Sequence, residues 1–146
     1  REAKAAAAKL GIVLQLIEAR APPDLDRALV AATKQRAEAL LVLPDPMFVA
    51  QARRIADLAT SRRLPVVSGV GAFADAGALA TCSPDHAGAY RRGAGYVDRI
   101  LKGTKPADLP VEQPVKFELV INAGAARTLG VAIPRALVAR ADRVIR

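Results

Sequence analysis

Two polar side chains, Asp45 and Ser68, stand where an α/β protein could hold a small molecule. Each follows a short apolar run that is typical of a buried parallel strand, residues 39–43 and residues 65–67. Open α/β sheets bind ligands just beyond the carboxyl ends of such strands, so both residues are expected at that edge. Asp45 also precedes Pro46 and is equally well placed to cap a helix, a role that is compatible with ligand contact.

The side chains that could carry out catalysis are few and isolated. The chain has one cysteine, Cys82, and one histidine, His86. A single cysteine excludes an intramolecular disulfide and a cysteine-based zinc cluster, and a single histidine argues against a histidine metal site or a Ser/His triad. The sequence predicts a half-buried, inert thiol at Cys82 and a surface position for His86. The carboxylates are too scattered to form a glycosidase pair, so we expect no catalytic residue, no metal site and no enzyme activity.

Glycines at 69 and 71 follow a predicted strand in the manner of a dinucleotide-binding motif. The third glycine of that motif is replaced by Ala74, no clean helix follows, and no acidic residue ends a strand about twenty residues later. A tight turn or hinge that needs close backbone approach explains the two glycines better. No nucleotide or other cofactor is therefore expected.

The positive charge of the chain raises the possibility of nucleic acid or an anionic membrane as a partner. The 146 residues include 22 Lys and Arg against 14 Asp and Glu, for a net charge of +8. These basic residues are spread along the sequence, aromatic residues make up only 3%, and no helix-turn-helix or zinc-finger pattern occurs. No apolar run approaches the ~20 residues that a membrane span needs. The sequence favours solvated basic helix faces and predicts no nucleic-acid binding.

Apolar runs alternate with amphipathic stretches in the first half of the chain, which predicts an α/β lobe. The short connections predict right-handed crossovers and a parallel sheet that is covered on both faces. The expected strands are residues 12–17, 39–43 and 65–68, and the expected helices begin near residue 21 and run over residues 47–61.

The second half of the chain is interrupted by glycine and proline. Ser83 and Pro84 are expected to begin a helix as its N-cap and first residue, and Gly103 to end it. The other expected elements are strands at 78–81 and 117–121, an extended connection at 104–114, a helix from Asn122 to Leu129, and one or two helices in 134–145. Because residues 1–10 form helix without a cap or a starting Met, we expect the chain to be part of a longer polypeptide that carries any localisation signal.

Three stretches carry a resemblance to a known family. They are residues 37–46 with the helix around residues 53–56, residues 63–80, and residues 96–134. The most specific run is Lys-Gly-Thr-Lys-Pro-Ala-Asp-Leu-Pro-Val-Glu-Gln-Pro-Val-Lys-Phe-Glu-Leu-Val-Ile-Asn, residues 102–122. Together they resemble the substrate-binding proteins of bacterial ABC transporters, in the branch typified by tryptophan-binding-type receptors.

The resemblance implies a type I periplasmic-binding-protein-like fold, in which two α/β lobes close on a ligand. The chain would then supply a parallel-sheet, three-layer lobe together with a segment that belongs to the second lobe. Residues 1–76 would form the α/β lobe without its first strand, and residues 77–110 would return to the other lobe with their helix. Residues 111–146 would cross back to the first lobe and form the C-terminal helices.

The resemblance also implies a function and a set of ligand-binding residues. The function is that of a solute receptor for an ABC importer, without chemistry of its own, that binds a small polar organic molecule such as an amino acid. A membrane permease would be its partner, and its location periplasmic or lipid-anchored at the outer face of the cytoplasmic membrane. The implied ligand-binding residues are Asp45, Pro46, Ser68, Gly71, Phe73, Thr81 and Asp85.

Three further points stay open at this stage. The effector-binding domain of a transcription regulator has the same fold and is the alternative function. Cys82-Ser83 stands where relatives often have Tyr-Gly or Ile-Gly, which leaves the identity of the ligand undecided. Helix 84–102 would expose apolar residues without a second lobe, so self-association of the chain is expected.

Overall fold

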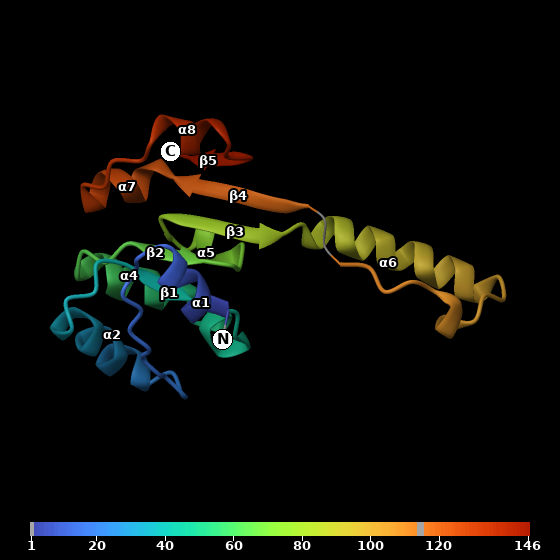
Figure 1. The fold of residues 1–146 in the computed structure, drawn as a ribbon, viewed down its shortest axis with the longest axis horizontal. Helices are drawn as coiled ribbons and strands as arrows, with labels where there is room; N and C mark the ends of the chain where they lie inside the picture. Colours follow the sequence, from blue (N-terminus) through green and yellow to red (C-terminus); the bar gives the residue numbers. More distant parts are fainter. Residues whose placement is uncertain (1, 114–115) are drawn as a thin grey trace.

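The computed structural model describes residues 2–113 and 116–146. Within them, a sheet in the order β1-β2-β3-β4-β5 is flanked by helices, which confirms the predicted α/β class (Figure 1). The strands are β1 (Leu40–Val42), β2 (Val66–Ser68), β3 (Ala80–Pro84), β4 (Phe117–Asn122) and β5 (Arg143–Ile145). Neighbouring strands are parallel except for the β3–β4 pair, which is antiparallel.

The helices vary from a single turn to more than four turns. They are α1 (Glu2–Lys9), α2 (Asp24–Lys34), α3 (Pro46–Ala50), α4 (Ala52–Ser61), α5 (Ala72–Asp75), α6 (His86–Leu101), α7 (Ala123–Leu129) and α8 (Arg135–Ala139), with a 3-10 turn, η1, at Pro106–Asp108. No helix in the described part of the chain has both the length and the apolar character that crossing a membrane requires.

The main core lies between the sheet and helices α2 and α4. Leu25 and Leu29 of α2 and Ile55 of α4 are almost fully buried against Val42 and Val66 of the two strands. Their spacing of three or four residues puts the apolar side chains of each helix on one face, and burial of each side chain contributes about 1.5–3 kcal/mol. The expected helices on either side of β1 are therefore confirmed.

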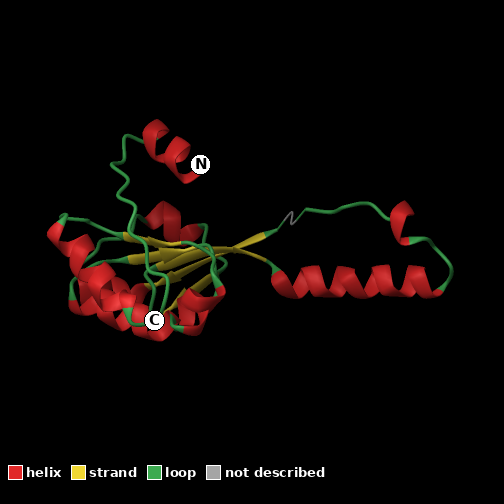
Figure 2. Ribbon diagram, turned by 90° about the horizontal axis from the view of Figure 1, so that it is seen from below, coloured by secondary structure: helices red, strands yellow, loops and turns green. Residues whose placement is uncertain are grey.

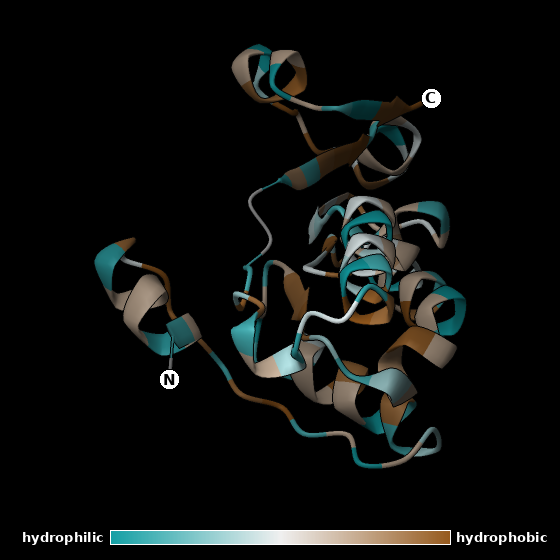
Figure 3. Ribbon diagram, turned by 90° about the vertical axis from the view of Figure 1, so that its right-hand side faces the viewer, coloured by the Kyte–Doolittle hydropathy of each residue, from teal (hydrophilic) through white to brown (hydrophobic). Residues whose placement is uncertain are grey.

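Residues 12–17 were expected to form the first strand, and that prediction is wrong. The segment is irregular and unpaired, and Val13 is 87% exposed. An extended segment becomes a strand only when a neighbour takes its backbone N–H and C=O groups, and the described residues place no strand beside it. Figures 2 and 3 show this apolar segment running from α1, on one side of the sheet, past the β1 edge to α2 on the other side.

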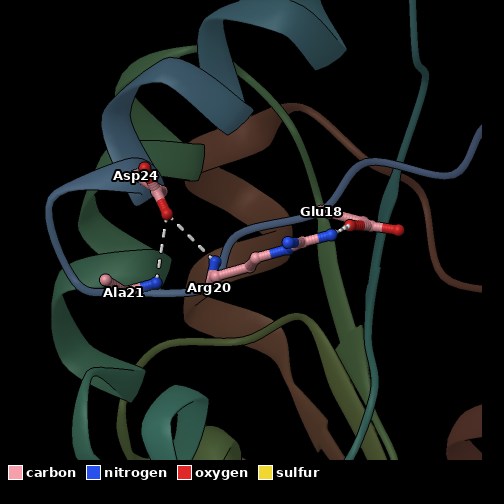
Figure 4. Close-up of polar contacts among 4 residues, drawn as sticks. All are labelled: Glu18, Arg20, Ala21 and Asp24. Carbon is pink, nitrogen blue, oxygen red and sulfur yellow. Dashed lines mark hydrogen bonds and ion pairs between the residues drawn. The ribbon is translucent and has the colours of Figure 1, made fainter.

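The turn that leads from this segment into α2 is nevertheless well defined. Asp24 Oδ2 accepts hydrogen bonds from the backbone N–H groups of Arg20 at 3.0 Å and Ala21 at 3.1 Å (Figure 4). The Arg20 guanidinium pairs with Glu18 at 2.9 Å. The first carboxylate of α2 thus fixes the chain in front of the helix, although the expected strand before it does not form.

Strands β3 and β4 lead into an arm, residues 85–113, that projects away from the sheet (Figure 1). The arm consists of α6 and the segment that returns beside it. Tyr96 Oη donates a hydrogen bond to the Pro110 carbonyl at 2.8 Å, and Arg92 pairs with Glu112 at 3.4 Å. Apolar residues of α6 face solvent, with Leu101 82% exposed.

Several predicted boundaries shift where pairing with another strand is possible. Ser83 and Pro84 do not begin α6 as predicted, because they pair with β4 and extend β3, and Asp85 is the N-cap instead. The C-terminal residues form α8 and then β5, not only helix, because β5 pairs with β4. The predicted helix 47–61 is divided at Gln51 into α3 and α4.

Other predicted boundaries are confirmed. Asn122 caps α7 by accepting a hydrogen bond from Ala125 N at 2.8 Å, and Gly130 ends the helix at a φ of +70°, which suits glycine. Residue 114, the last of the expected extended connection, lies outside the described residues.

Candidate functional site

Three segments at the carboxyl ends of β1, β2 and β3 meet at one edge of the sheet. We call them the strand-end site: residues 44–46, 69–71 and 82–85. Since β1, β2 and β3 run parallel, their carboxyl ends lie together. The contact is close, because a Cβ atom at Gly69 would lie 3.9 Å from the Cys82 carbonyl oxygen and 4.0 Å from Pro44 Cγ. The edge predicted from Asp45 and Ser68 is therefore formed.

Asp45 is exposed at this edge and caps α3. Its backbone is extended, and its Oδ1 atom accepts a hydrogen bond from Met47 N at 2.8 Å, while Pro46 occupies the first position of the helix. The predicted capping role is confirmed. Among the described residues, no Lys or Arg nitrogen forms an ion pair with this carboxylate. The Asp45 charge is thus available to a cationic group from solution.

Ser68 and Phe73 lie beneath the strand-end site. The Ser68 hydroxyl is buried, donates to the Val42 carbonyl at 3.0 Å and accepts from Val70 N at 3.2 Å. Phe73 is fully buried in the core and anchors the short helix α5. Both residues therefore position the loop after β2, and neither presents a free side chain to solvent.

Gly71 permits a close approach between this loop and β3. A Cβ atom at Gly71 would lie 3.1 Å from the Ser83 Oγ atom, a distance that forces one of them to move. The φ of Gly71 is −59°, so the glycine is needed for space and not for its backbone angle. The sequence identified Gly71 as a tight-turn residue, but the Ser83 contact had no signal in the sequence pattern.

Thr81 is fully buried in the middle of β3, beside Ser68 of β2 and Val120 of β4. Its hydroxyl has no hydrogen-bond partner among the described residues. A buried hydroxyl without a partner destabilises a fold by about 1–3 kcal/mol. Thr81 is therefore the one position near the strand-end site, within the described chain, where a polar side chain is buried without a partner.

Asp85 joins the strand-end site to the arm. Its Oδ1 atom accepts a hydrogen bond from Gly88 N at 2.9 Å, and its own N–H donates to the Lys116 carbonyl at 3.0 Å. The hydrogen bond from Gly88 lowers the pKa of Asp85, and the charges of Arg91, Lys116 and Arg92 lower it further, whereas desolvation opposes them. Asp85 is thus held as a carboxylate at neutral pH.

The remaining candidates for chemistry lie apart from one another. Cys82 is exposed, so the prediction of a half-buried thiol is wrong, whereas His86 has the predicted surface position in the first turn of α6. Residues 2–113 and 116–146 contain no group of three His, Cys, Asp or Glu side chains that could hold a metal ion. What this arrangement offers to a ligand is a carboxylate, backbone groups and close-packed loops.

Two hollows on the described surface lie away from the strand-end site. One of about 440 Å³ is bounded mainly by α7 and the following residues 130–133, and one of about 220 Å³ lies between α6 and residues 110–112. None of the seven predicted ligand-binding residues lines either hollow. Direct ligand contact by Asp45, Pro46, Ser68, Gly71, Phe73, Thr81 and Asp85 thus stays a prediction.

A family model described as ABC transporter substrate binding protein matches residues 1–145 of the chain. Among curated proteins, none matches the sequence.

Three solved structures share the fold. A conserved domain protein from Vibrio cholerae is 30% identical, with a TM-score of 0.88 over 97% of this chain and 47% of its own. The ABC domain from Streptococcus pneumoniae in complex with L-Trp is 25% identical, with a TM-score of 0.88 over 99% of this chain and 48% of its own. A ligand-free, open substrate binding protein with adhesive properties from Clostridium difficile is 18% identical, with a TM-score of 0.72 over 98% of this chain and 48% of its own. The chain spans about half the length of these structures.

Proposed function

The chain belongs to the ABC transporter substrate binding protein family, and we propose that it forms about half of a receptor that binds a small solute for an ABC importer. The observation that carries this proposal is the meeting of residues 44–46, 69–71 and 82–85 on the carboxyl-terminal side of β1, β2 and β3. Such an edge is the usual ligand site of open α/β sheets. The family membership favours transport over the alternative of a regulator's effector domain.

We propose a ligand with a cationic group, of which an amino acid is the first candidate. Asp45 supports this choice, because its exposed carboxylate has one oxygen free of the α3 cap. A charge-assisted hydrogen bond to an ammonium group is about twice as strong as a neutral one. The L-Trp complex of the Streptococcus pneumoniae domain, which is 25% identical, supports the same class of ligand.

The receptor that we propose has two lobes. Residues 1–76 belong to the first lobe, residues 77–110 return to the second by way of β3, which stays in the sheet, and residues 111–146 cross back. The projecting arm and its exposed Leu101 support this division. An isolated amphipathic helix gains most of its stability from packing its apolar face against another surface, which a second lobe would provide. We further propose a membrane permease as the partner, and a location outside the cytoplasm, in the periplasm or anchored by lipid to the membrane surface.

The experiment that tests the function is ligand-detected NMR on the 146-residue chain, with L-Trp as the first probe. One lobe contacts only one side of the ligand, so binding in the millimolar range, about −4 kcal/mol, is expected. Asp45→Ala should weaken it by about 1–3 kcal/mol, roughly 5- to 150-fold, whereas Asp57→Ala, which removes an exposed carboxylate on α4, should leave it unchanged.

Two results would contradict the proposal. An unchanged dissociation constant in Asp45→Ala would reduce that residue to a helix cap. Absence of binding by any amino acid or other small cationic solute, at concentrations up to about 10 mM, would remove the case for a solute site at this edge.

A further inference from the structure

The hollow of about 440 Å³ beside α7 lies apart from the strand-end site. We call it the α7 hollow. Ile121 of β4 and Val144 of β5, which are opposite each other in the sheet, line it together with α7, residues 130–133 and Val138 of α8. Figure 1 shows α7, α8 and β5 gathered at the β4–β5 end of the sheet. The volume of the α7 hollow falls in the range of about 300–1,000 Å³ that is usual for small-molecule sites.

The α7 hollow exists because many of the side chains around it are short. Helix α7 contributes Ala123 and Ala126 to the lining, and the loop after the helix adds Gly130 and Ala132. These residues fill little of the space beside the apolar side chains of the β4–β5 pair. Apart from Arg127, the lining residues within the described chain carry no polar side-chain atom. The hollow therefore offers an apolar surface, from which a hydrocarbon group displaces water favourably.

Arg127 is the one charged side chain in the described lining of the α7 hollow. Its guanidinium folds back along the helix, since a Cβ atom at Gly124 would lie 3.9 Å from Arg127 Nη2. No Asp or Glu side chain of the described residues forms an ion pair with Arg127. A guanidinium presents a planar set of N–H donors that matches the two oxygens of a carboxylate. Arg127 is thus placed to bind the carboxylate of a molecule that lies in the hollow.

The charges around the α7 hollow also favour an anion. Residues 123–146 contain five arginines and one acidic residue, Asp142. Asp142 is already engaged, because its Oδ2 atom accepts a hydrogen bond from Leu119 N at 2.8 Å. Arg143 pairs with Asp75 at 3.0 Å, and no other arginine of this segment has an ion pair within the described chain. The other arginines give this end of the chain an excess of positive charge, which attracts anions.

We propose that the α7 hollow is a second binding site of this chain, which takes a small apolar carboxylic acid. The carboxylate pairs with Arg127, and the aliphatic or aromatic part of the molecule lies against Ile121 and Val144. The apolar lining disfavours phosphates and sugars, because it leaves their further oxygens without hydrogen-bond partners. The two sites select opposite charges, since Asp45 at the strand-end site suits a cationic group and Arg127 requires an anionic one. An acid without an amino group therefore binds at the α7 hollow and not at the strand-end site.

The test is an NMR titration of the isotope-labelled 146-residue chain with hexanoate, hexanamide and acetate. Hexanamide keeps the hydrocarbon chain without the charge, and acetate keeps the charge with almost no hydrocarbon. We expect hexanoate to bind in the millimolar range and to shift the amides of α7 and residues 130–133 along one saturable curve. Both controls should bind at least about tenfold more weakly, because each lacks one of the two contacts. Equal affinity for hexanoate and either control overturns the proposal, as does the absence of a saturable shift with hexanoate up to about 10 mM.

Two pairs of variants separate the site from general attraction between charges. Arg127→Gln removes the guanidinium from the α7 hollow, and Arg140→Gln removes an equal charge from the same end of the chain, outside the lining. We expect Arg127→Gln to weaken hexanoate binding by about tenfold or more, and Arg140→Gln to change it by less than about twofold. Ala132→Phe should fill the hollow and abolish binding, whereas Ala136→Phe, on α8 and outside the lining, should leave it unchanged. Equal effects within either pair overturn the proposal.

Neither measurement involves the strand-end site, so the result for the α7 hollow is independent of the proposed function. Saturable hexanoate shifts that leave the amides of residues 69–71 unmoved, in a chain that binds no amino acid, would support this site and contradict the proposed solute receptor. Binding of L-Trp at the strand-end site without any binding of hexanoate would do the reverse.

Discussion

Ser68 and Thr81 lie opposite each other on β2 and β3, and removal of their buried hydroxyls should have opposite effects on stability. Ser68 has a donor and an acceptor partner, the Val42 carbonyl at 3.0 Å and Val70 N at 3.2 Å. Ser68→Ala leaves both backbone groups without their side-chain partner inside the protein, which costs about 1–3 kcal/mol. Thr81 has no partner among the described residues, so Thr81→Val removes an unsatisfied hydroxyl at nearly constant shape and should stabilise the fold by roughly 1 kcal/mol.

The assay is urea unfolding and thermal melting of both variants and the parent chain, each followed by circular dichroism. A domain of this size shifts its Tm by roughly 4 °C per kcal/mol, so Ser68→Ala should melt roughly 4–12 °C lower and Thr81→Val roughly 4 °C higher. Equal slopes of free energy against urea are required for the comparison, because a changed slope reports a changed denatured or native state.

The reasoning is tested by the direction in which each variant changes the free energy of unfolding. If Thr81→Val destabilises the chain by as much as Ser68→Ala, then the Thr81 hydroxyl has a partner that the structure does not show, such as a buried water. If Ser68→Ala leaves the free energy of unfolding unchanged, the two hydrogen bonds of Ser68 do not hold the loop after β2. Ser68 would then have no role in positioning the strand-end site.

Three further predictions concern helices α6 and α7. In acid, the first turn of α6 should loosen, because the pKa of Asp85 is lower in the folded chain than in the unfolded one. The stability that the Asp85 carboxylate gives to α6 is then fully present above the ordinary pKa of Asp and is lost as the pH falls through the folded-state pKa. NMR of the parent chain from pH 7 to 2 should show this step, and Asp85→Asn should lack it. Gly93→Ala should raise the stability of α6 by about 0.5–1 kcal/mol in thermal melts. Gly88→Ala should give no such gain, because a Cβ atom at position 88 would collide with the Asp85 carboxylate. Equal gains in the two variants would contradict this prediction. Asn122→Ala should cost about 1 kcal/mol in urea unfolding through loss of the α7 cap, and an unchanged midpoint would show that the cap is dispensable.

Local rules predicted the elements whose partners lie nearby in the sequence. The apolar spacing of α2 and α4, the Asp45 cap and the Gly130 helix end depend on residues within a few positions, and the structure has all of them. Of the predicted strands, the third forms and the first does not, because a strand needs neighbouring strands to pair with. Residues 66–68 pair with strands on both sides, whereas residues 12–17 have none beside them.

The errors arise where a long-range pairing overrides a local preference. Ser83 followed by Pro84 is a strong signal for a helix start, yet both residues pair with β4 because Glu118 and Phe117 lie opposite them. Residues 143–145 were likewise expected to be helical, but they form β5 because they pair with the free edge of β4. For the site, the sequence located the edge but could not show that Phe73 and Thr81 are fully buried.

The stability of the arm differs in kind from that of the sheet. The ion pair of Arg92 with Glu112 and the hydrogen bond of Tyr96 to Pro110 lie near the surface, where solvent competes for such contacts and they contribute little to stability. The sheet region has a buried core of interlocking side chains, whereas α6 leaves Tyr90 83% and Leu101 82% exposed. Because isolated helices of about this length are marginal in water, α6 needs a second surface to pack against. The strand-end site lies at the base of this arm, where Asp85 joins β3 to α6. In the proposed two-lobed receptor, the surface that covers the arm therefore also adjoins this site.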